Sequence, residues 1–77
     1  KYQGKDDLAV KNLLTALAKD NKDIEVKKEL AYQYHKKNDY VTAIKYYDEV
    51  LKAEPENYDV RANKALALYA INIMMKL

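Results

Sequence analysis

The side chains that could carry out covalent or metal chemistry are few in this sequence. It contains no cysteine and no serine, and it has two threonines, Thr15 and Thr42, and one histidine, His35. A catalytic nucleophile needs a base within hydrogen-bond reach, and a metal site needs several ligands gathered at one point. We therefore expect no enzyme activity, no metal site and no cofactor, and we expect His35 to be an ordinary helical histidine.

The paired acidic residues are explained without catalysis. Asp6-Asp7 falls at an expected helix start, and Asp48-Glu49 falls on an expected polar face. The helix dipole and solvation account for carboxylates at both kinds of place. Carboxylate catalysis would also need a pocket, which a single layer of helices in so short a chain is not expected to enclose. The only glycine, Gly4, argues against a phosphate-binding loop.

The charge balance argues against binding through a strong electrostatic field. The 77 residues include 14 lysines and arginines and 12 aspartates and glutamates, which gives a formal net charge of +2. This near balance predicts neither nucleic acid nor an anionic membrane surface as the partner. The longest apolar run near the end, 65–71, is too short to span a membrane.

The length of the chain limits it to one domain with a small core. A first residue of lysine suggests that the sequence is a piece of a longer protein. The absence of cysteine leaves the compartment undetermined, with the cytoplasm slightly favoured over a bacterial envelope location.

Helix-forming residues fill the chain, which predicts an all-α protein of four helices. Glycine and proline occur once each, whereas Ala, Leu, Lys and Glu are abundant. Asp6 and Asp23 are expected to cap the first two helices. Asn38-Asp39 is expected to form the turn between the second and third helices, because Asn tolerates the left-handed conformation. Pro55 is expected to end the third helix at Glu54.

These signals place helices at about 6–20, 24–37 and 40–53, and a fourth helix from 58 onward, opened by Asn57 or Glu56. Apolar residues recur in them at helical spacing. They are Leu8, Leu13, Leu14 and Leu17 in the first helix, Val26, Leu30, Ala31 and Tyr34 in the second, Ala43, Ile44, Tyr47, Val50 and Leu51 in the third, and Val60, Ala65 and Leu68 in the fourth.

The chain matches itself when it is shifted by 34 residues. The shift places Ala9 on Ala43, Val10 on Ile44, Lys11 on Lys45, Leu13 on Tyr47, Leu17 on Leu51, Val26 on Val60, Ala31 on Ala65 and Tyr34 on Leu68. The breaks match as well, because Gly4 falls on Asn38 and Asn21 falls on Pro55. One helical hairpin is therefore expected to be repeated.

The best unit, residues 24–57, resembles the tetratricopeptide repeat, whose 34-residue pattern has a Leu-Gly pair, a Tyr, an Ala-x3-Phe and a closing Pro. The matching residues are Leu30-Ala31, Tyr34, Ala43 with Tyr47, and Pro55. The resemblance implies antiparallel helical hairpins in a right-handed superhelix. Residues 6–20 would be the second helix of a preceding repeat, and 58–77 the first helix of a following repeat or a cap. Lys64 and Ile73-Met74 depart from the pattern.

The resemblance also implies a function, because these repeats bind peptides or partner proteins in a groove lined by their first helices. The proposed groove residues at matching positions are Lys28, Tyr32, His35, Lys36, Asn63, Leu66 and Tyr69. Tyr32 could stack on a peptide, while Lys28 and Lys36 could attract carboxylates. The alternative is that both lysines simply belong to a solvated helix face.

Two other hypotheses of binding remain open at this stage. The fourth helix is apolar all round, so Ile71, Met74 and Met75 could mediate dimerisation or swapping between copies of the chain. Lys28 and Asn63 also match two positions of a carboxylate clamp that holds acidic chaperone tails, although Tyr32 replaces an expected Asn. A regulatory piece of an enzyme whose catalytic domain lies elsewhere is a further reading.

Overall fold

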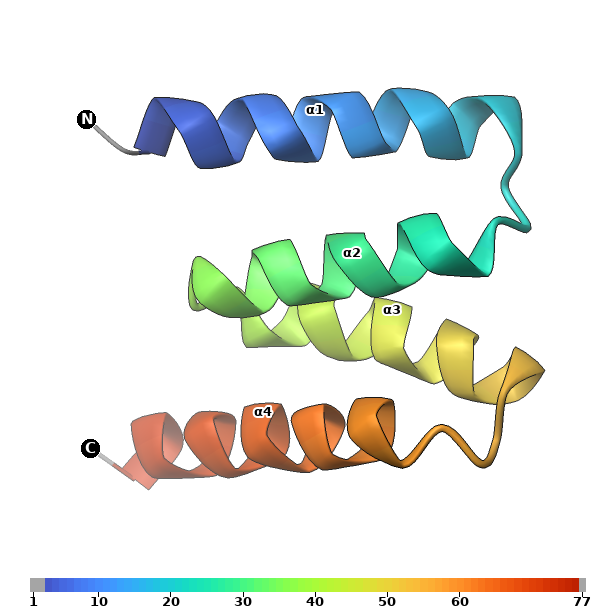
Figure 1. The fold of residues 1–77 in the computed structure, drawn as a ribbon. Coiled ribbons are helices and arrows are strands. Elements are labelled where there is room, and N and C mark those ends of the chain that lie inside the picture. Colours follow the sequence, from blue (N-terminus) through green and yellow to red (C-terminus); the bar gives the residue numbers. More distant parts are fainter. Residues whose placement is uncertain (1–2, 77) are drawn as a thin grey trace.

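The computed structural model describes residues 3–76, and the side chains of residues 8–76. Residues 3–76 form four helices, α1 (Gln3–Lys19), α2 (Ile24–Lys36), α3 (Tyr40–Ala53) and α4 (Tyr58–Lys76). No strand occurs within residues 3–76. Consecutive helices run antiparallel, so both ends of the described chain lie on the same side (Figure 1). The predictions of an all-α fold and of four helices are confirmed.

Short polar side chains determine where three of the helices begin. The carboxylate of Asp23 accepts a hydrogen bond from the backbone N–H of Val26 at 3.2 Å, and Asp39 caps α3 in the same way at 3.3 Å. The side chain of Asn57 accepts from the N–H of Val60 at 3.1 Å, which selects Asn57 over Glu56 as the start of α4. Each side chain satisfies a donor that has no partner within its helix.

The turn between α2 and α3 also follows the sequence prediction. Asn38 adopts a positive φ of 68°, the left-handed conformation that Asn tolerates better than most residues. The backbone N–H groups of Asn38 and Asp39 donate to carbonyls in the last turn of α2. The turn therefore satisfies carbonyls that the end of α2 leaves free, and it reverses the chain within a few residues.

The predicted start of the first helix is wrong. Asp6 was expected to be the N-cap, but α1 already begins at Gln3 and passes through Gly4. One glycine inside a helix costs only about 1 kcal/mol relative to alanine, so it does not have to end the helix. Acidic residues also stabilise the first turn as readily as the cap. The side chains of Asp6 and Asp7 lie outside the described residues, as does residue 77.

Tyr47 of α3 lies at the centre of the core, with only 1% of its surface exposed. The same buried cluster contains Ala31 of α2, Ala43 and Val50 of α3, and Ala67 of α4. The alanines allow neighbouring helices to approach closely, and the tyrosine ring fills the space beside them. Around this cluster, the rings of Tyr34 and Tyr46 stack with an interplanar angle of 9°.

The main contacts join helices that are consecutive in the chain, so the molecule is an open slab of 39 × 36 × 15 Å. The smallest dimension lies between one and two helix diameters. As a result, α2 packs against a helix on each side, whereas α4 packs mainly against α3 (Figure 1). The two outer helices therefore keep large parts of their surface exposed.

This open packing corrects the predicted inner face of α4. Val60 is buried as predicted, but Ala65 and Leu68, which were expected to be buried like Ala31, are exposed, and Ala67 enters the core instead. Ala31 is covered because α3 follows α2, and no helix in the described chain covers the equivalent face of α4. Leu8 and Leu14 of α1 are exposed as well, because α1 has a neighbour on only one side.

An ion pair explains why Lys64 departs from the repeat pattern. Its ammonium group contacts the carboxylate of Asp48 across the α3–α4 interface. The residues 34 positions earlier are Leu30 and Leu14, both apolar. At equivalent positions, α4 and α3 thus carry an oppositely charged pair, whereas α2 and α1 carry two leucines.

The position of Tyr47 predicts a large effect of its removal. Tyr47→Ala is expected to lower the free energy of unfolding by about 3–5 kcal/mol, the usual cost of truncating a buried aromatic residue. A small domain has only about 5 kcal/mol or somewhat more to lose, so most of the helical structure should disappear. Urea denaturation followed by circular dichroism measures the change.

Tyr69→Ala is the matched control, because it makes the same substitution at a side chain that is 64% exposed. It should change the free energy of unfolding by no more than about 0.5 kcal/mol. Equal destabilisation by the two substitutions would contradict the described core.

Candidate partner-binding surface

Tyr32 is the most accessible aromatic side chain on α2, with 52% of its surface exposed. The ammonium group of Lys36 lies 5.5 Å from the centre of its ring, one helical turn later. This is a cation–π contact, which draws the lysine over the ring and gives the pair a combined aromatic and positive surface. The structure thus brings two of the predicted groove residues together.

Lys28 is engaged with carboxylates of its own chain. Its Nζ lies 3.0 Å from Glu25 in α2 and 3.2 Å from Glu54 at the end of α3. The hydrogen bonds that Lys28 donates to Glu25 and to Glu54 raise the pKa of Lys28, and the hydrogen bonds that Glu54 accepts from Asn57 and from Lys28 lower the pKa of Glu54. An incoming carboxylate would have to compete with two that are already in place.

His35 points into the contact between α2 and α3. Its Nδ1 shares a hydrogen bond of 3.0 Å with the hydroxyl group of Tyr47, and its ring meets Tyr40 edge-on at 5.4 Å. Burial raises the pKa of Tyr47, which keeps the phenol neutral. The histidine is half-buried. Its contacts make it a structural partner of the core tyrosine, although the sequence placed it on the groove.

The predicted residues on α4 differ in their exposure. Asn63 is half-buried, whereas Leu66 and Tyr69 are 58% and 64% exposed. Tyr58, which the sequence analysis did not single out, is exposed too, and the guanidinium group of Arg61 lies 5.8 Å from its ring centre. The exposed side of α4 is therefore rich in large apolar and aromatic side chains.

The three residues proposed for self-association line one hollow of about 300 Å³. Ile71, Met74 and Met75 form its α4 wall, and residues 38–41, from the turn into α3, form the other. Ile71 is half-buried, while both methionines are exposed. These residues thus lie beside the start of α3, on a different part of α4 from Leu66.

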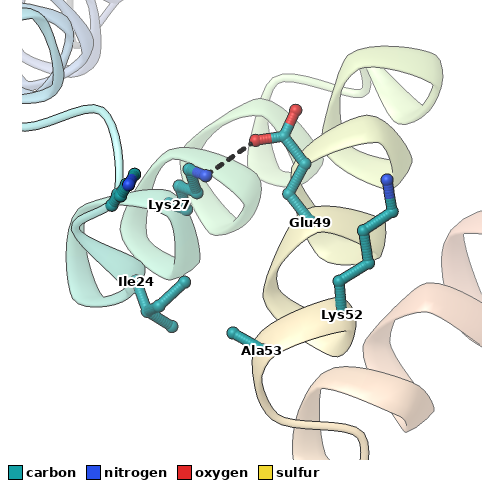
Figure 2. A pocket seen from close by; sticks show the side chains of 6 residues that line it. Ile24, Lys27, Glu49, Lys52 and Ala53 are labelled. Carbon is teal, nitrogen blue, oxygen red and sulfur yellow. Dashed lines mark ion pairs between the residues drawn. The ribbon is translucent and has the colours of Figure 1, made fainter.

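A hollow between the start of α2 and the end of α3 was not predicted. It has a volume of about 580 Å³ and is lined by Lys22, Ile24, Lys27, Glu49, Lys52 and Ala53. In Figure 2, Lys27 of α2 points across to Glu49 of α3, and the ion pair between them measures 3.0 Å. Lysines at these positions could attract an anionic group. No local sequence signal marks the hollow, because it depends on how the two helices align.

Comparison with protein-family models gives no match, and comparison with curated protein sequences gives none. Within residues 3–76, no helix is both long enough and apolar enough to cross a membrane. The described His, Asp and Glu side chains form no group of three or more that could hold a metal ion.

The ion pairs of Lys28 predict how stability depends on pH. The pKa of Glu54 is lowered from its ordinary 4.5, so its contribution is complete above that pH and is lost as the pH falls through the folded-state pKa. The pKa of Lys28 is raised from 10.5, so its contribution is complete below that pH and is lost as the pH rises through the folded-state value. The unfolding free energy should therefore be highest between these limits.

The substitution Glu54→Gln should reduce the loss of stability on the acid side, because it removes the carboxylate that titrates there. Glu56→Gln, at an exposed neighbour, is the control and should leave that loss unchanged. Urea denaturation at several pH values gives the measurement. An acid-side loss of the same size in Glu54→Gln and in the unchanged chain would contradict the assignment.

Proposed function

We propose that this chain is a protein-interaction module of the tetratricopeptide-repeat type, which binds an extended peptide or a partner protein along α2 and α4. The 34-residue self-match and the antiparallel hairpins support the repeat. In such an arrangement, successive hairpins would continue as a right-handed superhelix, and the first helix of each hairpin would line the binding groove.

The observation that carries the proposal is the shared exposure of Tyr32 and Leu66. They occupy the same position of the 34-residue pattern, and their exposed fractions are 52% and 58%. Large apolar side chains that lie exposed in successive units are the kind of surface a partner covers.

The proposed recognition relies on apolar and aromatic contacts more than on charge. Tyr32 offers a flat ring for a peptide side chain, and Lys36 beside it adds a positive group. Lys28 already contacts Glu25 and Glu54. This arrangement argues against the carboxylate clamp, in which Lys28 would act with Asn63, because a clamp lysine has to reach the ligand.

Peptides that bind the chain, selected from a displayed peptide library, provide the test of this proposal. Selected peptides should lose at least about tenfold in affinity on Tyr32→Ala or Leu66→Ala, which corresponds to about 1.4 kcal/mol for one buried apolar side chain. Isothermal titration calorimetry measures each affinity. Lys28→Ala should change the affinity for an acidic C-terminal peptide little, whereas a strong loss would restore the clamp hypothesis.

Two matched controls distinguish binding at the proposed surface from nonspecific binding to exposed apolar side chains. Leu68→Ala removes an exposed leucine from another side of α4, and Tyr58→Ala removes an exposed tyrosine from its start. Both should leave the affinity unchanged. If they weaken binding as much as Leu66→Ala and Tyr32→Ala do, the proposed surface is wrong.

A further inference from the structure

The interface between α2 and α3 is built from small and aromatic side chains on both helices. Ala31, Tyr34 and His35 come from α2, and Ala43, Tyr46, Tyr47 and Val50 come from α3. These two sets of side chains form one row on each helix. The rows meet in the buried cluster, in the stacked tyrosines and in the hydrogen bond between His35 and Tyr47. Each row is complementary to the other.

Both rows recur elsewhere in the molecule at an interval of 34 residues. On α4, the positions of Ala31, Tyr34 and His35 are occupied by Ala65, Leu68 and Tyr69. On α1, the positions of Ala43, Tyr46, Tyr47 and Val50 are occupied by Ala9, Asn12, Leu13 and Ala16. The chain thus carries a counterpart of each side of the α2–α3 interface, in which Asn12 and Ala16 of α1 are smaller than Tyr46 and Val50 of α3.

The burial of equivalent residues shows that the α4 counterpart is open and that the α1 counterpart is only partly covered. Ala31 and Ala43 are completely buried, whereas Ala65 is exposed and Ala9 is only half-buried. Leu68 is 49% exposed. The two outer helices therefore present matching halves of an interface that the hairpin in the middle of the chain has already formed.

We infer that α4 of one copy of this chain packs antiparallel on α1 of a second copy, in the manner in which α2 packs on α3. The occupant is a second copy because the contact continues the series of helix pairs already present, α1 on α2, α2 on α3 and α3 on α4. The α4 half and the α1 half are different surfaces. The contact is therefore head-to-tail, and each added copy presents a new open face.

The side chains that would meet are compatible in size. Tyr69 facing Leu13 replaces His35 facing Tyr47, so each pair brings one tyrosine together with one smaller side chain. Ala65 has the same small size as Ala31 and permits the same close approach. The large ring changes sides in this pair. Leu68 facing Asn12 replaces the stacked Tyr34 and Tyr46, so this part of the contact is smaller.

Two contacts of the hairpin are missing from this arrangement, the stacked tyrosines and an ion pair. Arg61 and Thr15 stand at the positions of Lys27 and Glu49, so the ion pair between α2 and α3 has no counterpart. One pair of helices also buries less surface than a standard protein interface. The association should therefore be weak, and it should depend strongly on concentration.

Sedimentation velocity of the full chain, from micromolar to millimolar concentration, tests this inference. The average mass should rise past that of a dimer. Leu68→Glu blocks the α4 face and Asn12→Glu blocks the α1 face, because each places a charged carboxylate in a contact from which water is excluded. Both residues are exposed, so the variants should keep their helix content, which circular dichroism checks.

Each variant alone should stay monomeric, and an equimolar mixture should form a dimer that does not grow, because one intact face of each kind remains. Leu66→Glu, the same change on another side of α4, is the control and should associate like the unchanged chain. Leu66→Glu should nevertheless lose peptide binding. The experiment therefore distinguishes an error in the proposed peptide-binding surface from an error in the proposed contact between copies.

Three results would overturn the inference. The unchanged chain could remain monomeric at millimolar concentration. The two variants could fail to form a dimer when mixed. Asn12→Glu could still dimerise while Met75→Glu does not, which would indicate a symmetric contact through Ile71, Met74 and Met75.

Discussion

The packing of α2 against α3 around Tyr47 is the contact on which the rest of the structure depends. Two alanines, Ala31 and Ala43, bring the helices close, and the tyrosine ring fills the gap between them. His35 satisfies the tyrosine hydroxyl group, so a polar atom can be buried without losing its hydrogen bond. The outer helices α1 and α4 are joined to this central hairpin mainly through one side each. Their positions therefore follow from the hairpin, and their free sides become the surfaces available to partners.

The central hairpin also determines which side chains are available for recognition. Lys27, Lys28 and Lys64 each contact a carboxylate on a neighbouring element of the same chain. Some of the nearly balanced charges of the sequence thus form ion pairs between helices. Tyr32 and Leu66 remain exposed at equivalent positions of the repeated pattern. A partner would consequently meet an apolar and aromatic surface with modest charge beside it.

Most structural features that depend on residues close together in the sequence were predicted correctly. The caps at Asp23 and Asn57, the turn at Asn38 and the core of the central hairpin follow from local rules of capping, conformation and spacing. One local prediction failed, because α1 begins at Gln3 and not after a cap at Asp6. The other errors concern features that depend on more distant packing. Ala65 and Leu68 have the pattern of buried residues, but a pattern does not reveal whether a covering helix is present. Glu54, which pairs with Lys28, and Tyr47, which bonds to His35, come from the end of α3 and from α3, and helix spacing alone does not identify contacts between helices.

Hydrogen exchange of backbone amides, measured residue by residue by NMR, tests most directly whether the α2–α3 hairpin holds the structure together. Amides in cooperative, well-packed units exchange more slowly than amides in helices that open locally. If the account is correct, the slowest exchange occurs in α2 and α3 around Leu30 and Tyr47, with faster exchange toward the start of α1 and the end of α4. The slowest exchange in α1 or α4, with rapid exchange in the central hairpin, would contradict it.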